Sequence, residues 1–178
     1  MSTLRTGARR PPPEAAPIED SEACREEALK LLDRQRRPRA DLARRLGEKG
    51  YATATIVEVL ERLAAVGLVD DVEFARAFLA GRWGRRPSGW RRLQQELRAK
   101  GIAEPDVVAA RALIEQREGG VDELSTARKL LAQVAHRYAR LEPRVREQRL
   151  WALLARRGFD RDVIRRALAL SDDEGEVE

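Results

Sequence analysis

The 178-residue sequence has few aromatic residues, a single cysteine, Cys24, and a single histidine, His136. One cysteine cannot form a disulfide within the chain, and no metal-ligand partner lies near it, so we predict that Cys24 is a small core residue rather than a reactive thiol. A lone histidine without a nucleophile or carboxylate at a suitable spacing does not indicate a catalytic centre. The sequence also lacks an apolar run of about 18 residues and an N-terminal signal region, which predicts a cytoplasmic protein without a membrane span.

Motifs typical of enzymes are missing as well. Gly81 and Gly84 are not followed by the lysine and hydroxyl residue of a phosphate-binding loop. Asp70, Asp71 and Glu73 form the densest small acidic group, but no spacing brings further oxygen ligands toward them. We interpret Asp70 instead as a helix N-cap followed by Glu73. The sequence therefore predicts no catalytic residues, no metal site and no cofactor.

Charge is abundant, since Asp, Glu, Lys and Arg make up 37% of the chain. All but four of the 35 basic residues are arginine, whose planar fork suits phosphate and carboxylate groups. Coding bias in a high-GC genome is an alternative explanation for this preference, but it does not explain why the arginines cluster. The two ends differ from the rest: residues 1–20 hold four of the eight prolines and are expected to be a disordered arm, and residues 172–178 form an acidic tail.

A three-fold pattern of leucine and glycine organises the region between these ends. Two leucines four residues apart precede a glycine by eight and four residues, and an apolar residue follows the glycine; the copies are Leu42, Leu46, Gly50 and Tyr51, then Leu93, Leu97, Gly101 and Ile102, then Leu150, Leu154, Gly158 and Phe159. A basic residue stands before each glycine, as expected at a helix end that a left-handed glycine closes. An amphipathic helix precedes and another follows each copy.

The pattern predicts an all-α fold in which three tandem three-helix repeats form an elongated, curved array. The expected units are residues 21–69, 70–119 and 120–171. Because a unit of this size buries little surface, we expect adjacent units to share apolar contacts. The expected N-caps of individual helices are Ser21, Thr53, Ser88 and Asp160.

Basic residues gather around the middle helix of each predicted unit. The stretch 81–102 holds seven of them against Glu96, and residues 34–49 and 136–166 are also rich in arginine. One interpretation is a solvated helix face with charge pairs, but acidic partners are few in these stretches. The alternative is a surface for a phosphate backbone or an acidic protein groove. Trp90 has the spacing of a core residue, whereas Trp83 has two open interpretations, core packing and stacking on a base.

The middle repeat resembles the RecX proteins, which are bacterial regulators of the RecA recombinase. The resemblance lies in the Asp70–Asp71 helix start with Phe74 and Ala75, and in the helix that follows Gly89; that helix carries Arg92, Leu93, Glu96, Leu97, Lys100, Gly101 and Ile102. The first repeat is similar, and the third matches more loosely. The resemblance implies a curved helical protein that lies along the groove of the RecA–DNA filament. It also implies inhibition of the ATPase, co-protease and strand-exchange activities of RecA.

The leading hypothesis is therefore a monomeric, cytoplasmic regulator that contacts RecA and single- or double-stranded DNA. The predicted contact residues are Arg85, Arg86, Arg91, Arg92, Arg98 and Lys100, flanked by Arg44, Arg45, Lys49, Arg156 and Arg157. A sequence-tolerant DNA-binding protein without direct RecA regulation is the alternative. A nuclease is a third hypothesis, which the missing metal-ligand set disfavours.

Overall fold

The computed structural model describes residues 16–83, 87–117 and 122–173, and within these ranges the chain forms nine helices and one isolated β-bridge. The helices are α1 (Ser21–Arg34), α2 (Arg39–Glu48), α3 (Thr53–Ala65), α4 (Asp71–Trp83), α5 (Trp90–Ala99), α6 (Glu104–Arg117), α7 (Glu123–Tyr138), α8 (Pro143–Arg156) and α9 (Arg161–Asp173). The prediction of an all-α fold is confirmed.

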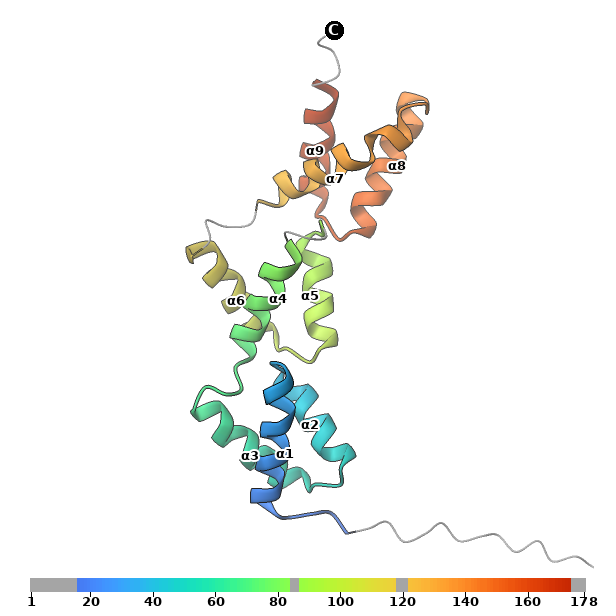
Figure 1. The fold of residues 1–178 in the computed structure, drawn as a ribbon. Coiled ribbons are helices and arrows are strands. Elements are labelled where there is room, and N and C mark those ends of the chain that lie inside the picture. Colours follow the sequence, from blue (N-terminus) through green and yellow to red (C-terminus); the bar gives the residue numbers. More distant parts are fainter. Residues whose placement is uncertain (1–15, 84–86, 118–121, 174–178) are drawn as a thin grey trace, which may run out of the picture.

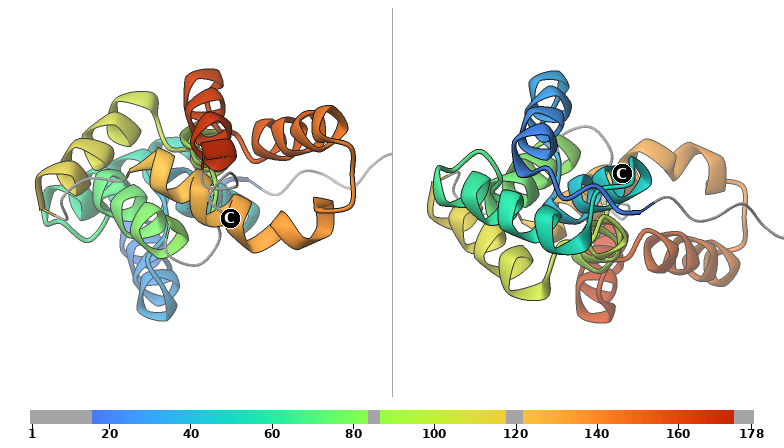
Figure 2. Two further views of the ribbon diagram at one scale, coloured as in Figure 1. Left: turned by 90° about the horizontal axis from the view of Figure 1, so that it is seen from above. Right: turned by 90° about the horizontal axis from the view of Figure 1, so that it is seen from below.

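The helices form three units that follow one another along the long axis of an elongated molecule (Figure 1). Unit one is α1–α3, unit two is α4–α6 and unit three is α7–α9. In each unit the first helix packs against the third, as α1 does on α3, α4 on α6 and α7 on α9. The views along the axis show that the helices of successive units point in different directions, so the units are rotated relative to one another (Figure 2).

Each unit has a core of its own. The leucines at equivalent positions, Leu46, Leu97 and Leu154, are fully buried and lie in three different clusters of buried side chains. Burying one such leucine contributes about 2 kcal/mol. Every buried residue of a cluster belongs to one unit, so the buried cores do not supply the apolar contacts that were expected between adjacent units. The apolar stripes of the helices are narrow, and packing within the unit already uses them.

The prediction that Cys24 is a small core residue is confirmed, and the residue lies in the core of unit one. Its side chain is fully buried, and the loss of hydration raises the pKa of the thiol. A buried neutral thiol behaves as a small apolar side chain.

The middle helices α2, α5 and α8 end as the leucine and glycine pattern predicts. Gly50, Gly101 and Gly158 adopt φ values of 91°, 82° and 81°, the left-handed region that favours glycine. After Gly101, the amide of Ile102 donates to the carbonyl of Leu97 at 3.2 Å, and the same bond recurs after the other two glycines. These bonds satisfy carbonyl groups that the helix end leaves without a partner.

The starts of α2 and α5 are capped by the unit that follows each of them. Neither helix has a side-chain cap of its own at Pro38 or Gly89. The amide of Arg39 instead donates to Asp71 Oδ1 of α4 at 2.9 Å, and the amide of Trp90 donates to Glu123 Oε1 of α7. We call these two places the first joint, between units one and two, and the second joint, between units two and three.

The same joints bring backbone very close to backbone. A Cβ on Gly101 would lie 2.3 Å from Cβ of Ala40, and a Cβ on Gly158 would lie 2.5 Å from Cβ of Arg92. At the second joint the amide of Gly89 also donates to the carbonyl of Arg157 at 2.9 Å. The end of α5 therefore abuts the start of α2, and the end of α8 abuts the start of α5.

Some predicted N-caps are confirmed. Asp70 accepts from the amide of Glu73 at 2.8 Å, and Asp160 accepts from the amide of Asp162 at 3.3 Å. The prediction for Ser88 is wrong, because Gly89 occupies the N-cap position of α5 and Glu123 supplies the carboxylate.

Two further N-caps near the N-terminus also differ from the prediction. Ser21 is already helical, and Asp20 caps α1 by accepting from two amides; Thr53 begins α3 after Ala52, which makes no side-chain cap. Of the arm expected to be disordered, residues 1–15 lie outside the described residues, whereas residues 16–20 are described. The amide of Ile18 donates to the carbonyl of Gly50 at 2.8 Å, so this segment is ordered against the end of α2.

Candidate functional site

The predicted contact residues differ in whether they have a polar partner within the chain. Arg85 and Arg86 lie outside the described residues. The others lie on or directly after the middle helices of the three units, where the pattern predicted them. Their side chains differ in whether a carboxylate already binds them, which decides what charge is left for a partner.

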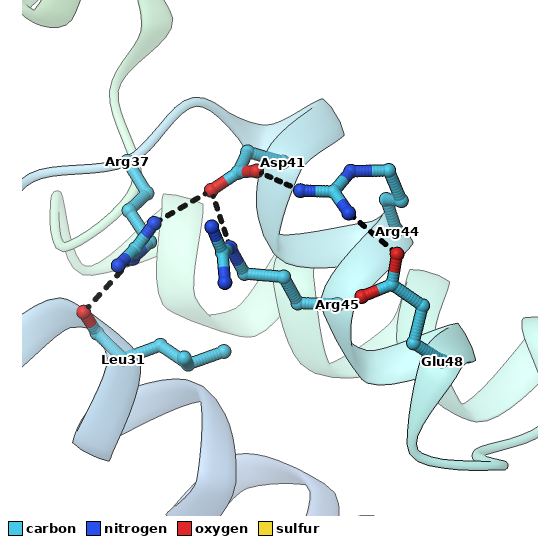
Figure 3. Close-up of polar contacts among 6 residues, drawn as sticks. All are labelled: Leu31, Arg37, Asp41, Arg44, Arg45 and Glu48. Atoms are coloured by element: carbon cyan, nitrogen blue, oxygen red, sulfur yellow. Dashed lines mark hydrogen bonds and ion pairs between the residues drawn. The ribbon is translucent and has the colours of Figure 1, made fainter.

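In unit one, the arginines converge on one carboxylate (Figure 3). Asp41 accepts from Arg37 at 2.8 Å and Arg45 at 2.9 Å through Oδ2, and from Arg44 at 2.7 Å through Oδ1. Burial alone would raise the pKa of Asp41, but the hydrogen bonds from Arg45, Arg44 and Arg37 outweigh it and hold that pKa at about 2. Asp41 is therefore a charged anchor for all three guanidinium groups.

The remaining predicted residues of unit one are also paired. Arg44 forms a second ion pair with Glu48, and Lys49 Nζ lies 2.6 Å from Glu27 Oε1. The hydrogen bond from Lys49 lowers the pKa of Glu27. The expectation that acidic partners are too few is wrong for unit one, where carboxylates on α1 and α2 neutralise Arg44, Arg45 and Lys49.

Unit two has both paired and unpaired cations. Arg92 binds Glu96 at 3.1 Å and Arg98 binds Glu104 at 2.6 Å. Arg91 is exposed and forms no ion pair with any described residue. Lys100 has no carboxylate partner there either, although its Nζ lies 5.6 Å from the ring centroid of Phe78.

Unit three carries the least neutralised charge. Many arginines of this unit form no ion pair with a residue that the structure describes; they are Arg137, Arg140, Arg144, Arg146, Arg149, Arg156, Arg161 and Arg166. Arg157 has a structural partner, because its Nη1 donates to the carbonyl of Pro87 at 3.3 Å across the second joint. Of the two predicted residues on this unit, Arg156 is free to meet a partner and Arg157 helps to hold the joint.

A groove of about 670 Å³ opens beside the second joint, between α5 and the α8–α9 corner. We call it the α5–α9 groove. Arg91, Arg92, Arg156 and Arg161 supply its cations and Glu96 its carboxylate. Apart from Gln95, the other lining residues are apolar and include Trp151, Phe159 and Ile164.

Trp151 is a groove residue that sequence reasoning missed. It is half-buried on α8 and packs against the core of unit three on one side. The available signal was its position directly after Leu150, on a helix with several arginines, since a tryptophan beside a core position borders both core and surface.

A second groove of about 520 Å³ occupies the equivalent place at the first joint. Its basic residues include Arg44 and Arg45, which Asp41 and Glu48 already bind. The two grooves thus have the same position in the repeat but a different balance of charge.

Of the other aromatic candidates, Trp90 does not line the α5–α9 groove. Trp90 is half-buried and packs against the core of unit two, as predicted, with the guanidinium of Arg111 4.6 Å from its ring centroid. Trp83 ends α4, and its side chain lies outside the described residues. The described residues contain no group of three or more His, Cys, Asp or Glu able to hold a metal, and no described helix is long and apolar enough to span a membrane.

Three domain families match the chain in order. They are described as the first, second and third three-helix domains of RecX, and they match residues 24–63, 70–116 and 121–168. Together the three matches cover most of the chain, and each match coincides with one of the three units.

Curated relatives are similar over most of their own length. A protein of Mycobacterium bovis named Regulatory protein RecX is 37% identical over 156 residues, which cover 84% of each chain. A protein of the same name from Halorhodospira halophila is 37% identical over 158 residues, covering 88% of this chain and 92% of the relative.

Solved structures share the fold. The crystal structure of RecX from Lactobacillus salivarius superposes with a TM-score of 0.78 at 21% identity, covering 86% of this chain and 97% of the other. A crystal structure described as regulatory protein RecX gives a TM-score of 0.71 at 25% identity, covering 80% of this chain and 70% of the other.

Proposed function

We propose that this chain, which belongs to the RecX family, binds the RecA–DNA filament and inhibits the ATPase, strand-exchange and co-protease activities of RecA. The observation that carries the proposal is the set of exposed arginines without ion pairs along an elongated array of RecX three-helix units. Such a surface attracts acidic protein surface and nucleic-acid phosphate, both of which a RecA–DNA filament presents.

The proposed mechanism is bridging rather than catalysis. The three units lie in file, so their middle helices α2, α5 and α8 follow one another along one molecule (Figure 1). The helices α5 and α8 carry exposed arginines without ion pairs among the described residues, Arg91 and Arg156. A chain bound across neighbouring RecA subunits would oppose the rearrangements that accompany ATP hydrolysis, because those rearrangements would break its contacts. Each core is complete within one unit, which supports action as a monomer. Since the proposed partner is RecA, we propose the cytoplasm as the place of action.

The test is the DNA-dependent ATP hydrolysis of RecA with this protein titrated in and single-stranded DNA in excess. Excess DNA removes simple competition for the DNA lattice. Inhibition at well below one protein per RecA is the expected result. Unchanged hydrolysis at a molar excess of the protein would refute the proposal.

The second candidate function is sequence-tolerant DNA binding without RecA regulation. The same unpaired arginines favour it, because they bind any polyphosphate. It predicts steep loss of DNA affinity with salt together with no effect on RecA hydrolysis, whereas the first proposal requires the effect on hydrolysis.

A further inference from the structure

We infer that the α5–α9 groove is a binding site for single-stranded nucleic acid, in which the phosphates contact Arg91, Arg156 and Arg161 and one base stacks on Trp151. The inference deepens the proposed function, since the filament contains a single strand. It assigns the site to the second joint and not to the equivalent groove at the first joint.

The charge of the groove is the first argument. Its sole lining carboxylate among the described residues, Glu96, already binds Arg92 at 3.1 Å and Arg82 at 3.2 Å. Arg91, Arg156 and Arg161 are exposed and have no ion pair with any residue that the structure describes. Three guanidinium groups around one groove therefore lack an anion, and a phosphodiester matches their bidentate geometry.

The apolar wall of the groove is the second argument. Trp151, Phe159 and Ile164 lie between the basic residues. Trp151 is half-buried and is held from behind by the core of unit three, so its indole is fixed at little further cost in entropy. A fixed aromatic ring beside cations is the arrangement on which single-stranded bases stack.

The combination selects one class of partner. The volume of about 670 Å³ lies in the range of small-ligand sites, so the groove admits a nucleotide rather than a folded domain. An acidic peptide would match the arginines, but its carboxylates would leave the indole without a stacking partner. Bases of a duplex are stacked on one another and do not reach a ring that is half-buried in a groove.

The first joint supplies the internal comparison. Its groove has a similar volume and also contains several arginines, but Asp41 binds Arg37, Arg44 and Arg45. A phosphate there would have to compete with a carboxylate that is already in place, and this lowers its net gain.

The test uses the full chain and a (dT)15 oligonucleotide in the absence of RecA. The groove variant is Arg91→Gln/Arg156→Gln/Arg161→Gln. The matched control is Arg25→Gln/Arg62→Gln/Arg165→Gln, which removes the same charge from exposed arginines that pair within their own helices with Glu22, Glu58 and Asp162. We expect the groove variant to lose affinity at least tenfold and the control to keep it within about twofold.

Salt dependence reports the phosphate contacts directly. Each phosphate contact with a single strand contributes about 0.7 to the slope of log affinity against log salt. We expect the slope to fall by roughly two in the groove variant. An unchanged slope would overturn the assignment of these arginines.

Stacking is tested on the wild-type protein, because Trp151 also supports the core and its removal could unfold unit three. The protein is labelled with 5-fluorotryptophan, and replacing Trp83 and Trp90 with phenylalanine in turn assigns their ¹⁹F resonances and leaves that of Trp151 by elimination. On addition of (dT)15 the Trp151 resonance should shift and that of Trp90 should not. An abasic oligonucleotide of equal length should bind roughly tenfold more weakly.

The opposite outcomes overturn the inference. Equal affinity for the abasic strand, or binding without a shift of Trp151, removes the stacking site. A 15-base-pair duplex or poly-glutamate that shifts Trp151 and binds as tightly as (dT)15 assigns the groove to another ligand class. Absence of binding refutes the site, but RecA inhibition by the same protein would leave the proposed function standing.

Discussion

At the scale of single residues, two of the glycines after the middle helices, Gly101 and Gly158, serve two purposes at once. Gly101 has a left-handed backbone, and it also lies against Ala40 with no space for a Cβ. Gly67 ends α3 with a similar φ of 73°, but nothing lies within 4 Å of a Cβ placed there. Comparing the two separates the cost of backbone strain from the cost of close approach.

Gly67→Ala should lower the free energy of unfolding by about 1–2 kcal/mol, the cost of a left-handed non-glycine residue. Gly101→Ala should cost roughly 1 kcal/mol more, because opening the first joint also loses the cap that Asp71 provides. Urea unfolding followed by circular dichroism measures both. Equal losses in the two variants would show that the close approach of Gly101 to Ala40 contributes nothing to the free energy of unfolding.

A second residue-scale prediction concerns acid. The pKa of Asp41 is about 2 in the fold and 3.8 in a free carboxyl, so between these values the unfolded chain binds more protons and stability rises with pH. Glu73, held at about 2 chiefly by its hydrogen bond with Arg76, contributes with the same sign. Burial raises the pKa of Asp71, which acts with the opposite sign.

Asp41→Asn should therefore flatten the rise in unfolding free energy between about pH 2 and pH 4. Asp33→Asn is the control, since Asp33 forms no ion pair with the described residues. Urea unfolding at several pH values measures the free energy of unfolding and therefore its slope against pH. A wild-type slope in Asp41→Asn would mean that Asp41 is not a stabilising anchor.

At the scale of helices, two adjacent acidic residues cap two different helices. Asp70 caps its own helix α4, while Asp71 caps α2 of the preceding unit; Asp122 and Glu123 repeat this arrangement for α7 and α5. In unit three the equivalent helix is α8. It starts at Pro143, which lacks the amide that would need a partner.

Asp71→Ala and Asp70→Ala should each cost about 1 kcal/mol, the usual value of a lost cap. Only Asp71→Ala should also loosen the first joint, because the cores of units one and two share no buried residue. Small-angle scattering should then show a broader distribution of overall dimensions for Asp71→Ala alone. The same broadening in both variants would show that the cross-unit bond does not set the geometry.

Local features of the helices were predictable and contacts between units were not. The leucine spacing and the stop at Gly101 depend on neighbours within one or two turns, which the sequence displays. The pairing of Arg45 with Asp41 is also local, at a spacing of four, and the sequence alone contained that signal. The bond from Arg39 to Asp71 spans 32 positions, and no periodicity indicates it. The same holds for the presence of Trp151 and Arg91 in one groove.

At the scale of the whole molecule, the separate cores and the graded charge are consistent with the proposed extended binding surface. The three units fold around their own leucines and meet through backbone and a few polar bonds, so the array has a defined course without a common core. Carboxylates bind most of the basic residues of unit one, and the arginines without an ion pair among the described residues concentrate toward unit three. We therefore expect the end that carries α8 and α9 to engage the filament.

The most direct test measures the inhibition of DNA-dependent ATP hydrolysis by RecA with three proteins: the wild type, the Arg91→Gln/Arg156→Gln/Arg161→Gln variant and the Arg25→Gln/Arg62→Gln/Arg165→Gln control. Circular dichroism first establishes that all three have the same helicity. We predict that the wild type and the control inhibit alike and that the groove variant needs at least tenfold more protein. Equal inhibition by all three would contradict the claim that the unpaired arginines beside the second joint form the contact surface.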